Sequence, residues 1–468
     1  MTKTGGLAYL IGTLDPFEAA TAGGTCVLDH THDAIFRRSP ITGRREAAVA
    51  AGPSRRTGEN DYLLDLAEGL AFHDGAPVTA DDVAASIEAA VGAGTTKSRL
   101  LGAQLSGIVA ARPIGLGSVL IETAGPRPLL DDRLALVRVV PAAYAHPGVA
   151  AGAPGTGPFR IVESGELGAL LEPARGGAGA EAVRLSAHID GDDRTDALLD
   201  GAQLAIEDPP LDRHTEILER GFRLEWTRSQ NILWMMFNCG HPILADAPVR
   251  RAIMQAIDPA ALSARANGGR LAAADSLLPR WHPEYASAPA HPRFSPAEAR
   301  RALRAAGFAD GLRLQLTVSS VTWVEHTAPL IVEQLAAVGV EAEIVVRHTS
   351  ELFTDDVPAG RFELLLSSGD PSSFALDGEF ILRWYLTGTW AREYCHAGGP
   401  DIDRLERLLD EARSAVDPAR RRDLLAEAQR RGAEAAFVVP IGHRQQPTAW
   451  SGRLAGFRPS RTTGLSFR

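Results

Sequence analysis

Histidine and acidic residues near the N-terminus form the densest group that could bind a metal ion. Asp29, His30, His32 and Asp33 offer imidazole and carboxylate ligands within one short stretch. On a helix, the two histidines would point in different directions, so we expect a solvated helix face here rather than a metal site. His396, in a glycine-rich loop, is a slightly better candidate ligand than this cluster, but we expect an exposed loop histidine first.

Motifs for catalysis or cofactor binding are missing from the sequence. It contains neither a GxSxG nucleophile elbow nor an HExxH zinc motif. The stretch from Gly92 to Ser98 is similar to a phosphate loop, but it lacks the glycine before Lys97 and follows a predicted helix, so we expect a flexible loop. The three cysteines show no CxxC spacing, which argues against a thiolate zinc site and allows at most one disulfide. We therefore predict no catalytic residues, no bound metal and no cofactor.

Aromatic residues stand where they could line a cleft. Trp234 lies in a predicted strand, Trp323 follows another, and Trp384, Tyr385 and Trp390 lie near a loop. An aromatic ring offers a large contact area at little cost in entropy, so such residues often line ligand sites. Core packing is the competing explanation for each of them.

Composition limits the classes of partner. The chain has 468 residues, enough for two large domains or about three of ordinary size. Its net charge of −10 argues against nucleic acid as a partner, since that needs clustered basic residues. No apolar run is long enough to span a membrane. The first residues, MTKTGGLAYLIGTLDP, lack the basic segment and long apolar run of an export signal, so the sequence as given predicts none.

Elements that would position these residues alternate between strands and helices, which predicts an α/β fold. FHDGAPVTADDVAASI, from Phe72 to Ile87, has a turn at Gly75 and then a helix with Thr79 as N-cap and Asp82 as its capping partner. Further along, Leu312–Val318, a helix through 328–338 and the strand VEAEIVV form a βαβ unit with parallel strands.

The other predicted elements follow from local patterns. We expect strands at 61–67, 118–123, 159–162, 182–186, 223–226, 232–237 and 436–441, a further strand at the start of the chain, and helices at 26–38, 81–91, 193–199, 247–257, 296–306, 401–412 and 418–434. The stretch 145–159, rich in glycine, proline and alanine, is expected to be a loop.

Several stretches together resemble the family 5 extracellular solute-binding proteins, the ligand-capturing subunits of peptide and nickel ABC importers. The first is the FHDG stretch above, which resembles the family's FHDG-x-P-x-T-A-x-DV pattern. The others follow in the family's order and cover essentially the whole chain: GGLAYLIGTLDP, GTGPFRIVE, FNCGHPILADAPVRRAIMQAID, SPAEARRALRAAGF, GVEAEIVV, GDPSSF and DIDRLERLLDEA.

The resemblance implies a two-lobed, periplasmic-binding-protein-like α/β fold of type II, the flytrap type. Lobe I would comprise residues 1–35, 156–238 and 433–468, with an accessory subdomain at 36–155, and lobe II residues 239–432. Crossings between the lobes are expected near Asn238 and Ala433. The ligand would bind between the lobes, and contact with both at once would favour the closed form. In this interpretation the FHDG stretch is a scaffold of the accessory subdomain.

Specificity is where the sequence departs from the family pattern. Many peptide-binding members hold the ligand's amino group with an aspartate at the position of Ser367, and dipeptide binders commonly place an arginine in the loop that here reads SSVTWVEHTA. A zwitterion buried without paired charges would cost several kcal/mol, so we expect a less charged ligand. We expect stacking on Trp323 or Trp234 and hydrogen bonds from Ser367, Ser368 and the backbone. The full set of predicted ligand-binding residues is Trp234, Asn238, Trp323, Ser367, Ser368, Asp370, Trp384 and His396.

The resemblance therefore implies a monomeric, non-enzymatic binding protein that captures a peptide-like or other small solute and delivers it to ABC permease subunits. It would work outside the cytoplasm, in the periplasm or at the cell surface. Two alternatives stay open. The missing export signal is compatible with a cytoplasmic sensor or carrier of a biosynthetic intermediate, and His396 or the His30 and His32 pair with a nickel-type metal-chelate carrier.

Overall fold

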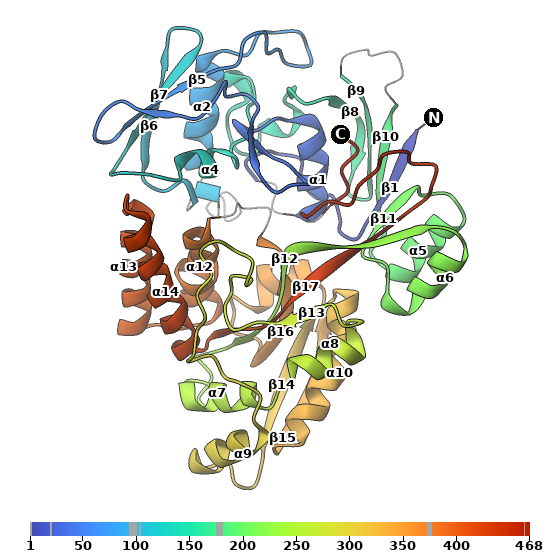
Figure 1. Cartoon of the computed structure of the whole chain (residues 1–468), viewed down its shortest axis with the longest axis vertical. Coiled ribbons are helices and arrows are strands. Elements are labelled where there is room, and N and C mark those ends of the chain that lie inside the picture. The colour runs from blue at the N-terminus through green and yellow to red at the C-terminus, as the bar shows by residue number, and fades with distance from the viewer. Residues whose placement is uncertain are drawn as a thin grey trace. The chain divides into compact units, whose positions relative to one another are not determined.

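The structure is a computed structural model that describes residues 2–18, 21–92, 101–102, 104–174, 181–371, 377–462 and 464–468. Most of the predicted loop from Gly92 to Ser98, and the end of the GDPSSF stretch, lie outside the described residues. Helices and strands alternate along the chain, which confirms the α/β class (Figure 1).

The chain divides into two compact units. Unit 1 contains Met1–Thr227 and Gln446–Arg468, and unit 2 contains Arg228–Pro371 and Asp377–Gln445. Two long strands, β12 (Arg223–Phe237) and β17 (Val438–Trp450), each contribute residues to both units. The predicted strands at 223–226 and 232–237 are thus one continuous strand, and the predicted strand at 436–441 extends to Trp450.

Unit 1 has one sheet built around the N-terminal strand. β1 pairs in parallel with β10 and β11, β9 and β8 extend the sheet beyond β10, and the end of β17 lies antiparallel to β11. The strands are β1 (Lys3–Leu7), β8 (Phe159–Gly165), β9 (Gly168–Pro173), β10 (Val183–Ala187) and β11 (Ala205–Glu207). One apolar core, which includes Leu7, Val27 and Leu185, packs around this sheet.

A second apolar core in unit 1 lies around the FHDG stretch. Here β4, β5, β7 and β6 form a four-stranded sheet and β2 and β3 a hairpin. Their bounds are β2 (Phe36–Arg38), β3 (Arg45–Ala47), β4 (Arg55–Arg56), β5 (Asp61–Asp65), β6 (Ile108–Ile114) and β7 (Ser118–Thr123). α2 (Ala80–Val91) buries Val83 and Ile87 against them.

The predicted turn and helix start of the FHDG stretch are confirmed. Gly75 has φ of 90°. The carboxylate of Asp82 accepts hydrogen bonds from the backbone N–H of Thr79 at 2.9 Å and from its hydroxyl at 2.8 Å. The stretch therefore acts as a scaffold that fixes the start of a buried helix.

The remaining helices of unit 1 are short. They are α1 (Ala22–Thr31), α4 (Leu130–Leu134), η1 (Ala142–Tyr144), η2 (Ala150–Gly152), α5 (Gly191–Leu199), η3 (Leu211–Arg213) and α6 (His214–Glu219). The helix predicted over 26–38 was wrong in extent, because α1 begins earlier and Phe36–Arg38 is strand β2. The hydroxyl of Thr21 caps α1 by accepting from the N–H of Gly24, and His32 is already extended.

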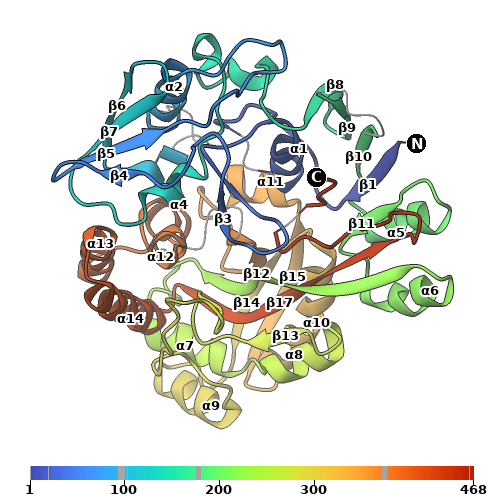
Figure 2. The same ribbon diagram turned by 45° about the horizontal axis from the view of Figure 1, so that its top comes forward.

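Unit 2 is built on a sheet with the strand order β15-β14-β16-β12-β17, and β13 pairs with β17. β14 (Leu312–Ser319) is parallel to both β15 (Val340–Arg347) and β16 (Leu364–Gly369), whereas β12 is antiparallel to β16. α10 (Thr322–Ala336) connects β14 to β15, which confirms the predicted βαβ unit. Figure 2 shows α10 along these strands.

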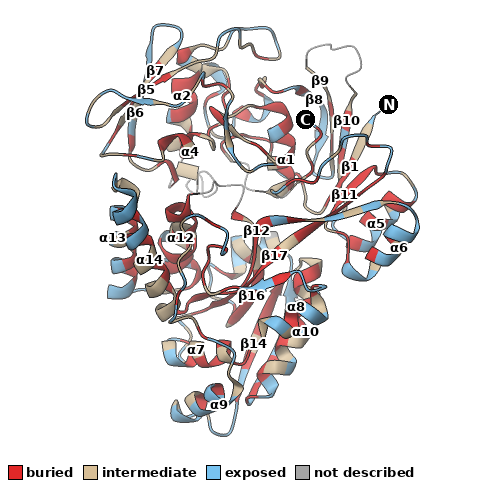
Figure 3. Cartoon of the chain, in the orientation of Figure 1, coloured by how far each residue is buried: buried red, intermediate tan, exposed pale blue. Residues whose placement is uncertain are grey.

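The two long C-terminal helices of unit 2 each bury one stripe of residues. In Figure 3, α13 and α14 show buried positions along one side and exposed positions elsewhere. The other elements of unit 2 are α7 (Ala247–Gln255), α8 (Pro259–Ala266), β13 (Leu271–Ala273), α9 (Pro296–Ala305), α11 (Thr349–Glu351), η4 (Leu352–Asp356), α12 (Gly378–Leu386), η6 (Trp390–Tyr394), α13 (Pro400–Ser414) and α14 (Pro418–Ala435).

Candidate functional site

The carboxyl ends of the parallel strands β14, β15 and β16 lie at one edge of the unit 2 sheet. In open α/β sheets, ligands bind outside the carboxyl ends of the strands. β14 ends at Ser319 and β16 at Ser367, Ser368 and Gly369. The hydroxyl of Ser367 donates a hydrogen bond to that of Ser319 at 2.9 Å. We call this the carboxyl edge of unit 2.

One face of the sheet at this edge is aromatic. Alternate residues of β12 point to opposite faces, and Leu233 and Met235 belong to the apolar core of unit 2, so Trp234 faces the other way. Its ring meets those of Trp390 at 5.5 Å and Phe353 and Tyr385 at 6.4 Å, all edge to face. Trp384 lies 6.0 Å from Trp390.

This aromatic group, with Tyr394 also in contact with Phe353 and Trp390, adjoins the end of β16. Trp234 pairs in register with Ser367. A methyl group on Gly369 would overlap the hydroxyl of Tyr385, so the backbone runs directly against that ring. Burial, and then the nearby carboxylate of Asp370, raise the pKa of Tyr385 above its ordinary value, so its hydroxyl stays protonated.

Buried side-chain atoms that find no hydrogen-bond partner among the described residues lie on β12 beside the same edge. Ile232 pairs in register with Gly369, and the two residues before it are Gln230 and Asn231. Among the described residues, neither the amide nitrogen nor the amide oxygen of Gln230 has a hydrogen-bond partner, and the same holds for the side-chain oxygen of Asn231. Both side chains are buried. Buried amides are normally paired, so these groups are fitted to accept a polar ligand or ordered water.

Trp323 lies in the first turn of α10 and faces the apolar core. It is 5% exposed, and the guanidinium of Arg444 covers its ring at 4.5 Å from the centroid. A cation over the ring face is a favourable contact. In this structure Trp323 and the fully buried Trp234 therefore pack against other side chains, and stacking of a ligand on either ring stays a prediction.

Asn238 and His396 lie at the opposite edge of the sheet. Because β12 is antiparallel to β16, the N–H of Asn238 bonds to the carbonyl of Glu363, just before β16 begins. The Asn238 amide donates to the carbonyls of Gly360 and Phe362 at 3.1 and 2.9 Å. About 17 Å of strand separates the two ends of β16, so these two residues do not meet Ser367, Ser368 and Asp370.

His396 occupies a tight position near Asn238. Its φ is 50°, and a methyl group on Gly360 would lie 3.2 Å from its Nε2 atom. That nitrogen is buried and has no hydrogen-bond partner among the described residues. The exposed loop histidine that we expected first is thus wrong in burial, because the residue is half-buried and its ring tip is enclosed.

The histidines near the N-terminus are structural in unit 1. His30 and His32 are 2% and 4% exposed, so the expected solvated helix face is wrong. His30 Nδ1 bonds to the carbonyl of Cys26 at 2.7 Å, and its Nε2 accepts from the N–H of Phe467 at 3.1 Å. His32 bonds to Thr31 and to the carbonyl of Ala153. Both nitrogens of each ring are therefore occupied.

Burial lowers the pKa of His30 to about 4 and that of His32 to about 3. The neighbouring carboxylates are also engaged, since Asp29 pairs with Arg138 at 2.6 Å and Asp33 with Arg468 at 3.1 Å. In the part of the chain that the structure describes, no three histidine, cysteine, aspartate or glutamate side chains are arranged to hold a metal ion.

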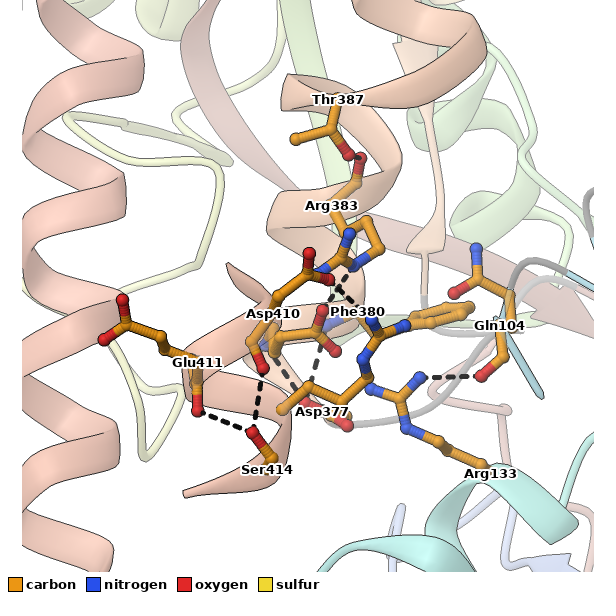
Figure 4. Close-up of polar contacts among 12 residues, drawn as sticks. Gln104, Arg133, Asp377, Phe380, Arg383, Thr387, Asp410, Glu411 and Ser414 are labelled. Carbon is orange, nitrogen blue, oxygen red and sulfur yellow. Dashed lines mark hydrogen bonds and ion pairs between the residues drawn. The ribbon is translucent and has the colours of Figure 1, made fainter. Parts of the chain in front are cut away.

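An ionic network holds α12, the helix that carries Trp384 and Tyr385. Asp377 caps α12 by accepting from the N–H groups of Glu379 and Phe380, and it pairs with Arg421 of α14 at 2.5 Å. Arg383 bonds to Glu379 at 2.5 Å and to Asp410 of α13 at 2.9 Å (Figure 4). Asp377 and Glu379 are buried, so these pairs fix α12 against its two neighbours.

The structure brings some of the predicted ligand-binding residues together, and their role in binding stays a prediction. Ser367, Ser368, Asp370, Trp234 and Trp384 lie at the carboxyl edge or in the aromatic group beside it. Sequence reasoning missed Ser319, Phe353, Gln230 and Asn231. Of the residues found, those at the end of β16 carry a local signal, because the apolar run LLL precedes two serines and a glycine there.

Comparison with known proteins gives the chain its context. The model of the bacterial extracellular solute-binding proteins, family 5 (middle region), matches residues 46–392. A probable di/tripeptide-binding protein 5 of Pseudomonas aeruginosa is 27% identical over 258 residues, which is 53% of this chain and 47% of that protein. The chain thus spans about half the length of the curated relatives it matches.

Two solved structures share the fold over their whole length. A dipeptide-binding protein from Pseudoalteromonas sp. SM9913 in complex with Met-Leu has a TM-score of 0.89 at 17% identity, and the match covers 100% of this chain and 99% of that one. The binding protein AgaA of A. tumefaciens R10 in complex with agropinic acid has a TM-score of 0.84 at 20% identity, with 99% and 96% covered. The periplasmic-binding-protein-like fold predicted from the sequence is confirmed. None of the described helices combines the length and apolarity that crossing a bilayer requires.

Proposed function

Because the chain belongs to the bacterial extracellular solute-binding proteins of family 5, we propose that it captures a small, peptide-like or similar solute for an ABC importer. In this proposal the protein acts as a monomer, breaks no bond and passes its ligand to the permease subunits. It works outside the cytoplasm. The division into lobe I, an accessory subdomain at 36–155 and lobe II stays part of the proposal, as does capture by closure of the two lobes.

The carboxyl edge of unit 2 carries this proposal. Backbone and hydroxyl groups of Ser367 and Ser368, the carboxylate of Asp370 and the unpaired amide of Gln230 would orient polar groups of the ligand. The aromatic group around Trp234 and Trp384 would contact its apolar part. A few polar groups beside an aromatic wall are typical of small-molecule sites.

The ligand we propose is less charged than a free dipeptide. Ser367 stands where an aspartate binds the amino group in many peptide-binding relatives, and it is already bonded to Ser319. The relatives named above hold, by their names, peptides or agropinic acid. A thermal-shift screen would therefore include Met-Leu, longer peptides, agropinic acid, sugars and nickel with L-histidine, because a ligand of the folded state raises the melting temperature.

Calorimetry with any hit then tests the site. We expect Ser368→Ala and Asp370→Asn to weaken binding about tenfold each, since the first removes a hydroxyl and the second removes the negative charge that strengthens a hydrogen bond to the ligand. Asp310→Asn is the matched control, because Asp310 is an exposed residue elsewhere in unit 2. Unchanged affinity in both edge variants would refute the carboxyl edge as the site. Micromolar binding of Met-Leu that survives them would refute the ligand class as well.

The alternatives have separate readouts. A nickel-chelate carrier would bind the nickel and L-histidine probe and lose that binding in His396→Gln, with the edge variants unaffected. A cytoplasmic sensor or carrier would be found in the soluble fraction of lysed cells after the periplasmic or surface fraction has been removed. Cell fractionation of the native gene product distinguishes this from an extracytoplasmic binding protein.

A further inference from the structure

Unit 1 contains a hollow of about 640 Å³, and none of its lining residues belongs to the proposed ligand site of unit 2. β1, the loop after β2 and the last segment of the chain build its wall, and every residue of that wall belongs to unit 1. The last segment is fixed against α1 and β11, since Phe467 N–H donates to His30 and Gly464 N–H to Glu207. The volume lies in the range of small-molecule pockets.

The wall of this hollow is rich in positive charge. Five cationic and two anionic side chains line it, and they are Lys3, Arg37, Arg453, Arg458, Arg468, Glu46 and Glu181. The protein as a whole has a net charge of −10. A cluster of arginines on an acidic protein attracts anions selectively, because the local potential differs in sign from the mean surface.

Three of the five cationic side chains in the wall form ion pairs. Arg37 pairs with Glu46 at 3.1 Å, Lys3 with Glu181 at 3.9 Å, and Arg468 with Asp33 at 3.1 Å.

For Arg453 and Arg458, in contrast, the described residues provide no ion pair, and both side chains are exposed. The guanidinium of Arg453 lies close to Gly201, where a methyl group would come within 3.2 Å of it. A guanidinium offers a planar fork of donors that matches carboxylate and phosphate oxygens.

An apolar surface lies beside these guanidinium groups. Phe457 is half-buried, and its ring packs 5.5 Å from Trp450 and 5.7 Å from Phe467. Leu454, also in the wall, is 6% exposed. The hollow therefore combines unpaired positive charge with an aromatic surface held in place by its neighbours.

We propose that this hollow of unit 1 is a second binding site, which takes a small organic anion with carboxylate or phosphate groups on Arg453 and Arg458 and an apolar group against Phe457. The site is independent of the proposed solute site, since it shares no residue with unit 2. Its failure would leave the solute-binding proposal untouched.

Calorimetry with the full chain tests the site with three probes: phenyl phosphate, inorganic phosphate and phenol. We expect phenyl phosphate to bind best, inorganic phosphate more weakly because it lacks the ring, and phenol not at all. The double variant Arg453→Gln/Arg458→Gln should weaken phenyl phosphate at least about tenfold, as expected for lost charge-assisted hydrogen bonds. Arg223→Gln, an exposed arginine of unit 1 outside the hollow, should bind as the wild type does.

A further arm separates a free anion from a lipid headgroup. Vesicles of phosphatidylglycerol would be added to the wild type and the double variant in a flotation assay. We expect no vesicle binding that depends on the two arginines. Binding to vesicles alone would overturn the small-anion assignment, and so would equal affinity for phenyl phosphate in the wild type and the double variant. Circular dichroism and melting temperature confirm that the variants are folded.

Discussion

The buried histidines of α1 predict how acid destabilises unit 1. The pKa of His30 is lowered to about 4 and that of His32 to about 3, chiefly by burial and secondarily by nearby arginines, with Arg468 near His30 and Arg138 near His32. A histidine in the unfolded chain titrates near 6.5. Below that pH the unfolded chain binds protons that the folded chain does not, so stability is fully present above about 6.5 and is lost as the pH falls toward 4.

The size of the effect follows from the two pKa values. Lowering the pH from 7 to 5 removes about 2 kcal/mol of stability for each of the two histidines. Glu207 acts in the opposite sense. Burial raises its pKa to about 6, so it stabilises the fold as it takes up a proton and returns about 1 kcal/mol over the same range. For the three groups together we expect a loss of about 3 kcal/mol.

Urea unfolding at pH 7 and pH 5 measures this loss, with the wild type compared with His30→Gln and His32→Gln. Glutamine keeps a hydrogen-bonding amide but does not titrate. Each substitution itself changes stability, so the readout is the difference between the two pH values. We expect that difference to shrink by about 2 kcal/mol in each variant.

His146→Gln is the matched control, because His146 is exposed. Its pH difference should equal that of the wild type. The same wild-type difference in His30→Gln and His32→Gln would refute the reasoning, since it would show that neither ring is held neutral by the fold.

Three more predictions concern unit 2 and the thiols. Glu379→Gln removes the buried carboxylate that pairs with Arg383, which keeps its second partner Asp410, and we expect a loss of about 1–3 kcal/mol in urea unfolding. A change under about 0.5 kcal/mol would show that the network does not hold α12. Gly369→Ala forces a methyl group onto the Tyr385 hydroxyl and should cost about 1–3 kcal/mol, with a changed near-ultraviolet circular dichroism signal from the aromatic group; an unchanged signal and midpoint would contradict the close approach seen here. Burial raises the pKa of the thiols of Cys26, Cys239 and Cys395, so in folded protein at pH 8 they should react with a disulfide reagent more slowly than after unfolding. Cys239 is only half-buried, so the test rests on the other two, and fast labelling of Cys26 or Cys395 would contradict their burial.

Local signals in the sequence sufficed for elements that are stable on local grounds. The capped helix after Gly75 and the βαβ unit from Leu312 to Arg347 each carry a period, a cap and a turn residue that agree. Where tertiary contacts decide, prediction failed. Gly23 and Gly24 let α1 lie directly against backbone carbonyls of Leu10 and Ile11, a contact that no local pattern reveals.

The arrangement of the candidate site also depends on long-range contacts that local sequence patterns do not reveal. Sequence reasoning placed Asn238 and Trp234 in one set of ligand-binding residues with Ser367 and His396. The antiparallel pairing of β12 with β16 separates them, because it joins Trp234 to Ser367 and carries Asn238 to the beginning of β16. Strand direction is a long-range property that no residue type encodes. If Asn238 supports the loop at Gly360 rather than a ligand, Asn238→Ala should lower stability by about 1–3 kcal/mol for the unpaired carbonyls it leaves, with ligand affinity unchanged at temperatures where the variant is folded.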